Sequence, residues 1–330
     1  MKALESILRR ARNNPGHIVL AEGDDTRVID AALRAVRDEI ATVTLVGDTT
    51  RICRAIETMG GRSEELSIVE PDRARQAGDA ITFAAHMVRR GEADGVIAGA
   101  VATTADTVRT YLQVIGPASA NNIVSSFFLI LLCDDDHPRK GAFAFADCGL
   151  VIEPTVEQLS QIAISSADSF AILTNEEPRV AMLSFSTLGS AKHSRVDRVV
   201  EATKVVRQSR PDLAVAGEMQ FDAAFIPLVS AVKAPGSHVG GQANVLVFPN
   251  LEAGNIAYKV AQWIGRAVAI GPILQGLARP ANDLSRGCSA DDIYHMIAIT
   301  SVQSATDVGR ASIPPIRPAP AKLRRWTTDC

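Results

Sequence analysis

The sequence predicts an α/β protein with two domains, each built on a mainly parallel sheet flanked by helices, with an active-site cleft between the domains. Two observations support this prediction. The chain has 330 residues, which exceeds the length at which one hydrophobic core usually stops growing. Short apolar runs also alternate with helical patterns along most of the chain, and this alternation is typical of βαβ units whose strands lie parallel.

The alternation begins near the amino terminus. Residues 17–21 and 41–47 are apolar runs that predict strands, and residues 26–37 between them have a helical period. Further strands are expected at residues 66–69, 95–98, 127–132 and 142–145. The later strands end beside small or polar residues, which is where open α/β sheets bind their ligands.

A second series of elements begins after Pro154, so the second domain is expected to start between the two series. Its helices and strands are predicted at residues 156–166, 180–185, 196–209 and 245–248. A helix expected at residues 291–302 follows the turn-rich residues 279–289 and would return to pack on the first domain. The predicted boundaries place residues 1–125 and about 285–310 in the first α/β domain and residues 126–284 in the second.

The last residues, 311–330, have a different composition. They include Pro314, Pro315, Pro318 and Pro320 together with several basic side chains. Proline removes backbone donors and this composition buries little apolar surface, so we expect a disordered basic tail.

The composition argues against several classes of protein. The formal net charge of −3 gives no general attraction to nucleic acid or to an acidic membrane. No apolar run reaches the ~18 residues of a membrane span, and residues 1–14 predict an amphipathic helix rather than a secretion signal. We therefore expect a cytoplasmic protein that binds anions through local geometry.

The cysteines and histidines show no metal-binding pattern. The five cysteines have no Cys-x-x-Cys pair and the six histidines have no His-x-x-x-His spacing. We expect reduced thiols and no metal. Neither a Gly-x-Ser-x-Gly frame nor a Walker A motif occurs, so a hydrolase nucleophile and the commonest NTPase site are not supported.

The first candidate site lies where an expected strand runs through small residues into a helix. Thr103 and Asp106 fit a capping box, which places the helix start at this point. The free amides of a helix start bind anions, and Gly99 with Ala100 would let phosphate approach the backbone closely. Arg109 could add a bidentate contact to phosphate. An ordinary capped helix with Arg109 as a surface charge explains the local pattern at least as well.

The second candidate site is a polar turn that leads into the helix expected near residue 291. Ser285 and Arg286 place a hydroxyl and a guanidinium in this turn, and Asp291 or Asp292 supplies a carboxylate to the same loop. A cation, a hydroxyl and a base suit acyl transfer. Ser289 and Asp292 also form a capping box, which alone would explain both residues.

The third candidate site is the C-terminal edge of the strand expected at residues 245–248. The polar or small residues that follow this strand are Asn250, Glu252, Gly254 and Asn255. Residues in this position often contact a ligand. Turn chemistry, with Asn250 starting an Asx-turn, remains the alternative.

Short motifs occur in a recognisable order between about His17 and Ser304. They are Ala93-Asp94-Gly95, Gly99-Ala100, Thr104-Ala105-Asp106-Thr107 with Arg109, Phe145-Ala146-Asp147-Cys148, Ser184-Phe185-Ser186-Thr187, Gly189-Ser190-Ala191, Gly217-Glu218, Asp222-Ala223-Ala224, Asn244 to Lys259, Gly271-Pro272 and Asn282 to Ser289. Each motif is weak alone. In this order and density they resemble the phosphate acetyltransferase (phosphotransacetylase) family of the wider phosphate acetyl/butyryltransferase group.

The resemblance implies a two-domain α/β homodimer in which acetyl phosphate and CoA meet in the interdomain cleft, with no cofactor beyond CoA as a substrate. It implies that acetyl is transferred reversibly between CoA and inorganic phosphate by direct thiolate attack in a ternary complex. The family's phosphate-binding arginine falls on Arg109, and Thr103 and Thr104 fall where the family lines its phosphate pocket.

The remaining roles follow from the same resemblance. Ser285 and Arg286 match the serine and arginine of the active loop, and Asp292 matches the catalytic aspartate. Proton transfer from a thiol of ordinary pKa ~8.5 to a carboxylate of ordinary pKa ~3.9 costs roughly 6 kcal/mol. We therefore expect Arg286 to stabilise the thiolate while Asp292 orients or accepts the proton. The residues expected to line part of the CoA cleft are Asn250, Glu252, Gly254 and Asn255.

Two departures from the family pattern bear on affinity. Ala102-Thr103 stands where the family usually has a His-Ser pair, which keeps a hydroxyl and loses an imidazole. The stretch between residues 71 and 91 is shorter than usual and lacks a basic segment that supplies a second substrate arginine. Arg89 and Arg90 are candidate substitutes.

Three other functions are alternatives to a phosphate acetyltransferase. A phosphate butyryltransferase would differ only in the volume of its acyl pocket. A non-catalytic sensor of acetyl-CoA or acetyl phosphate would not need Ser285, Arg286 and Asp292. A decarboxylating dehydrogenase of related architecture would need clustered metal-binding aspartates, whereas residues 134–136 are better interpreted as a solvated turn.

Overall fold

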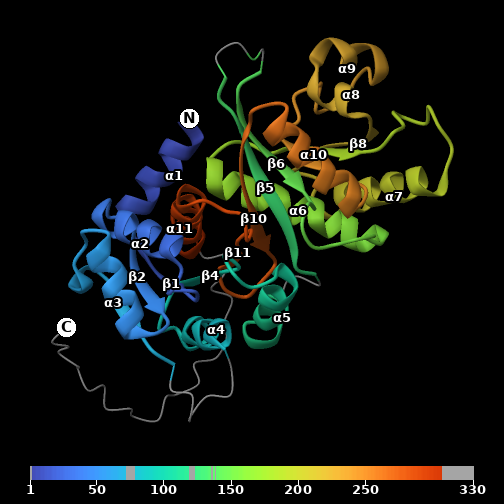
Figure 1. Cartoon of the computed structure of the whole chain (residues 1–330). Coiled ribbons are helices and arrows are strands. Elements are labelled where there is room, and N and C mark those ends of the chain that lie inside the picture. Colours follow the sequence, from blue (N-terminus) through green and yellow to red (C-terminus); the bar gives the residue numbers. More distant parts are fainter. Residues whose placement is uncertain (1, 72–78, 119–122, 135–136, 138, 307–330) are drawn as a thin grey trace. The chain divides into compact units, whose positions relative to one another are not determined.

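The computed structural model describes residues 2–71, 79–118, 123–134, 137 and 139–306. The chain divides into two compact units, and helix α1 (Lys2–Asn13) contains the first boundary between them. The N/C unit consists of Leu8–Gly116 and the chain from Leu277 onward, and the central unit consists of Met1–Ile7 and Pro117–Gly276. The tail expected at residues 311–330 lies outside the described residues. Figure 1 labels many of the elements of both units.

The N/C unit is built on a five-stranded sheet with the order β11–β4–β1–β2–β3, in which every neighbouring pair is parallel. Its strands are β1 (Gly16–Leu20), β2 (Ala41–Val46), β3 (Ser67–Val69), β4 (Gly95–Ala98) and β11 (Ala281–Asp283). Because parallel strands end at the same edge of a sheet, the loops after β1, β4 and β11 emerge side by side.

The helices of this unit begin at polar capping residues. They are α2 (Thr26–Arg37), α3 (Thr49–Thr58), α4 (Ala80–Arg90), α5 (Thr104–Val114) and α11 (Ala290–Ser304), with a short 3-10 helix at Ser63–Glu65. The side chains that accept a hydrogen bond from each first turn are Asp25, Asp48, Asp79, Thr103 and Ser289. Helix α11 is buried over most of its length and packs against β1, β4 and α2, so it forms the centre of this core.

The central unit contains a six-stranded sheet with the order β10–β5–β6–β9–β7–β8. Its strands are β5 (Ser125–Leu132), β6 (Gly141–Ala146), β7 (Arg179–Leu183), β8 (Ala214–Met219), β9 (Val245–Val247) and β10 (Val268–Gln275). Strand β5 is antiparallel to both β10 and β6, whereas the pairs from β6 to β8 are parallel. Its helices are α6 (Val156–Thr174), α7 (Ser194–Ser209), α8 (Phe221–Phe225), α9 (Pro227–Lys233) and α10 (Leu251–Trp263).

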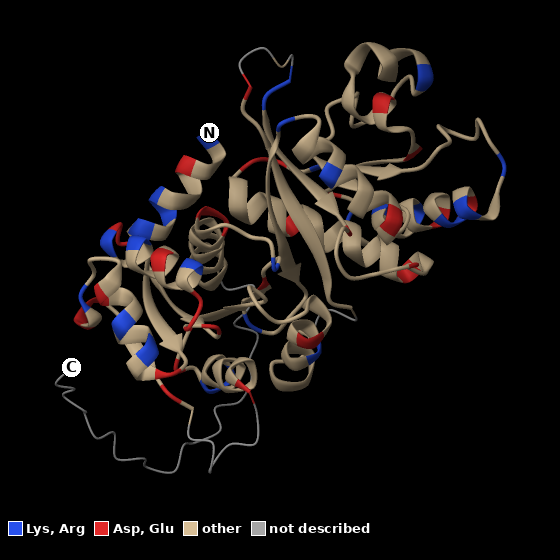
Figure 2. Cartoon of the chain, in the orientation of Figure 1, with Lys and Arg blue, Asp and Glu red and all other residues tan. Residues whose placement is uncertain are grey.

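The predicted fold class is confirmed, because the chain is an α/β protein with mainly parallel sheets flanked by helices. Figure 2 shows that most charged residues lie on helices and loops and that the strands are largely uncharged. The apolar runs therefore form the two sheets, as the alternation of patterns predicts. Within the described ranges, no helix combines the length and apolar character that crossing a bilayer requires.

Strand β11 differs from the expectation. It lies within residues 279–289, which we expected to be turn, and it pairs with β4. Its sequence is polar, so hydrogen bonding in the sheet, not an apolar pattern, makes it a strand; the buried Asn282 also donates to Thr300 Oγ1 at 2.8 Å. In these parts of the chain the boundaries of the two units lie at 116/117 and 276/277, whereas we expected them at 125/126 and 284/285. The pairing of β11 with β4 accounts for the second difference.

Candidate active site

Two of the three candidate sites lie on neighbouring strands of the N/C unit. The β4 loop (Gly99–Thr103) and the β11 loop (Leu284–Ser289) follow strands that pair in parallel, with Asp283 opposite Ala98. The Leu284 amide donates to the Ala98 carbonyl at 2.8 Å, which joins the two loops at their start. The fold therefore brings the expected phosphate-binding residues and the expected active loop to one edge of one sheet.

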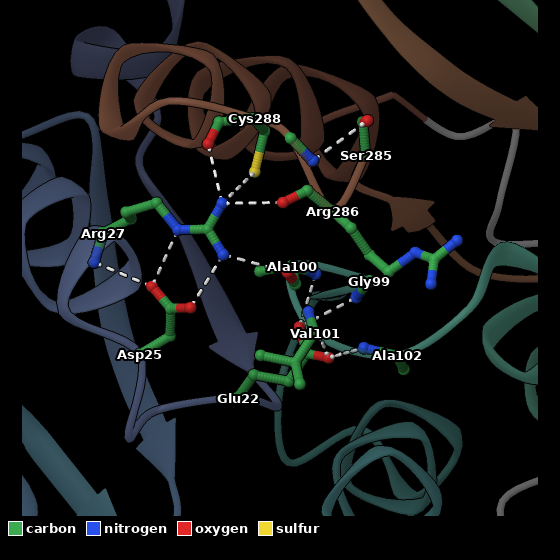
Figure 3. A network of polar contacts seen from close by, with 11 residues as sticks. Glu22, Asp25, Arg27, Gly99, Ala100, Val101, Ala102, Ser285, Arg286 and Cys288 are labelled. Carbon is green, nitrogen blue, oxygen red and sulfur yellow. Dashed lines mark hydrogen bonds and ion pairs between the residues drawn. The ribbon is translucent and has the colours of Figure 1, made fainter.

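Glu22, which follows β1 closely, organises the β4 loop. Its Oε2 accepts hydrogen bonds from the amides of Gly99 at 2.9 Å and Ala100 at 2.6 Å. Its Oε1 accepts from Val101 at 3.0 Å and Ala102 at 2.7 Å. Figure 3 shows the carboxylate beneath this run of four amides. Gly99 and Ala100 were expected to let phosphate approach the backbone closely, but their amides bind the protein's own carboxylate.

Arg27, one residue into α2, connects the two loops. Its guanidinium pairs with Asp25 at 2.8 Å and donates to the carbonyls of Ala100 at 2.9 Å, Arg286 at 3.0 Å and Cys288 at 2.8 Å. The hydrogen bond from Arg27 holds the pKa of Asp25 below its usual value. One side chain thus fixes a carbonyl of the β4 loop against two carbonyls of the β11 loop (Figure 3).

The β11 loop presents its arginine side chain to solvent. Arg286 is exposed, and no group in the described part of the chain pairs with its guanidinium, although its carbonyl is bound to Arg27. In Figure 3 the guanidinium extends away from Arg27. The Ser285 hydroxyl accepts from the Gly287 amide at 3.3 Å and is also exposed. A fixed backbone with a free cation suits the capture of an anionic ligand.

The start of α5 carries the expected phosphate-binding side chains. The Thr103 hydroxyl accepts from the Asp106 amide at 3.2 Å and donates to the Asp106 carboxylate at 2.7 Å. Arg109 pairs with Asp106 at 2.7 Å, and both side chains are more than half exposed. Solvent screens an exposed pair of this kind and leaves it weak, so Arg109 can exchange this partner for a ligand at little cost.

Asp292 caps the helix that follows the β11 loop. Its Oδ2 accepts from the amide and the hydroxyl of Ser289, both at 2.8 Å, and the Ser289 hydroxyl accepts from the Asp292 amide at 3.2 Å. The capping box proposed as the alternative is therefore present. The second oxygen, Oδ1, has no partner in the described ranges, so capping leaves one oxygen of Asp292 able to accept a proton.

Asp283, at the end of β11, is a buried carboxyl beneath these loops. Neither of its oxygens meets a hydrogen-bond partner among the residues that the structure describes. Burial raises its pKa to about 7, and the Glu22 carboxylate adds to the rise. A methyl group on Gly99, whose φ is +104°, would clash with the Asp283 carboxylate. This packing explains why glycine occupies the first position of the β4 loop.

The buried Asp283 carboxyl should make the folding stability of the protein depend on pH. The folded pKa of Asp283 lies above the ordinary value, so its contribution to folding stability is largest at acidic pH and is lost as pH rises toward 7. From pH 5 to pH 8 this loss is roughly 2–3 kcal/mol. Asp283→Asn cannot titrate and should lack this loss. Urea unfolding of both proteins at the two pH values measures the difference, and parallel pH profiles would contradict the assignment.

The third candidate site lies in the central unit. Asn250 caps α10 by accepting from the Ala253 amide at 3.0 Å, and Asn255 donates to the Cys148 carbonyl at 3.0 Å. Gly254 lies so close to the Asp147 carbonyl that no side chain fits there. Three of the four expected residues thus shape the backbone at the ends of β6 and β9, while Glu252 is exposed.

Two further carboxylates in the central unit act as Glu22 does. Asp147 accepts from the Ser126 hydroxyl at 2.6 Å and from the amides of Gly149 at 2.7 Å and Leu150 at 3.0 Å. Glu218 accepts from the Ser186 hydroxyl and the Gly189 amide, both at 2.8 Å. Both residues belong to the motifs that carry the family resemblance, and neither role was predicted from the sequence. An acidic residue at or just after a strand end was the available signal.

Comparison with known proteins agrees with this architecture. The family model described as phosphate acetyl/butaryl transferase matches residues 2–81 and 72–301. A phosphate acetyltransferase of Paracoccus denitrificans is 49% identical, over 92% of this chain and 100% of its own. One from Acetivibrio thermocellus is 44% identical, over 92% and 98%. The crystal structure of a phosphotransacetylase from Streptococcus pyogenes superposes with a TM-score of 0.84 at 39% identity, covering 92% of this chain and 99% of its own.

The fold and these relatives define an acyltransferase enzyme. The chain belongs to the phosphate acetyl/butaryl transferase family.

Proposed function

We propose that the chain is a phosphate acetyltransferase that moves acetyl reversibly between CoA and inorganic phosphate, with both substrates bound together. The observation that carries the proposal is the exposed Arg286 guanidinium, which pairs with none of the residues that the structure describes, on a backbone fixed by Arg27. The curated relatives named phosphate acetyltransferase support acetyl as the acyl group.

The proposed chemistry is one displacement at the acetyl carbon. The CoA sulfur loses its proton and forms the new C–S bond. The C–O bond to phosphate breaks as phosphate leaves. Asp292 accepts or orients the thiol proton through its free Oδ1, and Arg286 with Ser285 stabilises the thiolate. CoA enters as a substrate, and we propose that Asn250, Glu252, Gly254 and Asn255 line part of its site.

Arg109, with Thr103 and Thr104, is proposed to bind the phosphate. Charge grows on phosphate as it leaves, and a guanidinium stabilises that charge in the transition state. Arg109→Ala is expected to lower kcat and to raise KM for acetyl phosphate, each by about 10-fold or more. Initial rates at varied acetyl phosphate and CoA concentrations separate the two parameters. A change confined to KM for CoA would contradict the phosphate assignment.

The first experiment is an acyl-CoA synthesis assay. Wild-type protein is mixed with CoA and acetyl, propionyl or butyryl phosphate, without added metal or nucleotide. Fastest turnover with acetyl phosphate supports the proposal. Fastest turnover with butyryl phosphate favours a butyryltransferase, and tight acetyl-CoA binding without turnover favours a sensor.

We further propose a cytoplasmic homodimer with no bound metal or permanent cofactor and with neither nucleic acid nor membrane as a partner. Helix α10 supports the dimer. Ile256, Val260 and Trp263 on α10 and its C-cap residue Ile264 recur at helical spacing and are 63%, 49%, 78% and 79% exposed. Burying such a stripe against a second copy removes it from water. Light scattering that gives the mass of one chain at micromolar concentration would contradict the dimer.

A further inference from the structure

Glu22 places one carboxylate against four consecutive amides of the β4 loop. The four N–O distances are 2.9, 2.6, 3.0 and 2.7 Å for Gly99, Ala100, Val101 and Ala102. Hydrogen bonds from an amide to an ionised acceptor are stronger than those between neutral groups. Because each carboxylate oxygen accepts from two amides, the loop is fixed from Gly99 to Ala102.

Arg27 binds the loop that Glu22 holds in place. The Ala100 carbonyl accepts from Arg27 at 2.9 Å, and the same guanidinium binds the Arg286 carbonyl at 3.0 Å. Glu22 is therefore connected, through Ala100 and Arg27, to the Arg286 main chain. The β4 loop also leads directly into the Thr103 cap of α5, which carries Arg109.

We propose that Glu22 is a positioning residue for acyl transfer, which holds the start of α5 and the Arg286 backbone in one fixed arrangement by occupying the four amides of the β4 loop. This inference rests on the proposed function and adds a residue that the reaction needs without contacting its substrates. By filling the amides, the carboxylate also directs phosphate to the side chains of Arg109, Thr103 and Thr104.

The test compares Glu22→Ala, Glu22→Gln and wild type in acetyl-CoA synthesis. Misplacement of reacting groups by about 1 Å costs up to ~100-fold in rate, so we expect kcat to fall by about 10- to 100-fold in both variants. KM for CoA should stay within about twofold of wild type, because no group assigned to CoA is removed. The glutamine amide adds a donor facing four donors, so Glu22→Gln should be impaired even though its size is unchanged.

Formate is the specific readout. In Glu22→Ala the four amides are left beside a space that a small carboxylate can enter, and added sodium formate should restore kcat at least several-fold. Glu22→Gln, whose side chain fills that space, should show no rescue, and sodium chloride at equal ionic strength is the salt control. Thermal unfolding of Glu22→Ala with and without formate separates the two roles, because a purely structural role requires the regained kcat to follow a regained folded fraction.

Each outcome decides the matter. If both variants keep kcat within twofold of an active wild type, or if Glu22→Ala loses activity that formate does not restore, the positioning role is wrong. If Glu22→Ala does not fold, Glu22→Gln with unchanged kcat overturns the proposal and with a selective fall in kcat supports it. An inactive wild type would instead show that the proposed function fails.

Discussion

Replacing Arg286 with alanine is expected to lower kcat/KM for acetyl-CoA formation by about 10²- to 10³-fold, the usual cost of removing one preorganised charge-stabilising group. The Arg286 main chain is held by Arg27, but the guanidinium itself pairs with nothing in the described part of the chain. Its removal therefore takes charge from the site and leaves the fold intact. Initial-rate kinetics with circular dichroism of both proteins measure the two effects.

Two variants make this result specific to Arg286. Arg54→Ala removes another exposed arginine of the same unit, on α3, and should keep the wild-type rate. Arg286→Lys keeps the charge and loses the planar fork, so its activity should lie between wild type and alanine. An Arg286→Ala protein as active as Arg54→Ala would remove Arg286 from the reaction.

The second large effect is expected for Asp292→Asn, which should lower kcat by about 10²- to 10⁴-fold, the usual contribution of a general acid or base. Asparagine can still accept the Ser289 hydrogen bonds that cap α11, but it cannot take a proton. The loss should therefore appear in kcat with little change in the unfolding midpoint. Rates at saturating CoA and acetyl phosphate, together with thermal unfolding, give both quantities.

Asp291→Asn is the matched control for this substitution. Asp291 is the adjacent carboxylate of the same helix turn, but it pairs with Arg34 at 2.6 Å on the exposed side of α2. It should keep near-normal turnover. Near-normal turnover in Asp292→Asn as well would rule out proton transfer by Asp292 and leave its capping role alone.

Much of the fold could be predicted because the strands of parallel sheets are apolar runs. The runs at residues 17–21, 41–47 and 95–98 match β1, β2 and β4 closely. Strand β11 could not be predicted in the same way, because Ala281–Asp283 is polar and gains its extended structure from pairing with β4. The boundary prediction at residue 284 differed from the structure for the same reason.

In the candidate site, local features could be predicted from the sequence and long-range contacts could not. The spacing of Thr103 to Asp106 and of Ser289 to Asp292 predicted two capped helices, and both caps are present. The contacts of Glu22 and Arg27 could not be predicted, because each joins loops that are more than 70 residues apart in the chain. The roles of Arg109, Ser285, Arg286 and Asp292 remain predictions that the variants above test.

The division of the N/C unit between two distant segments has a consequence for its synthesis on the ribosome. Residues 117–276 separate its first segment from β11 and α11, and at ~5–20 residues per second they take roughly 10–30 s to translate. During that interval β4 has an unpaired edge, which is a site for wrong pairing. We expect the central unit to fold first and the N/C unit to mature last, once the final helix has been made.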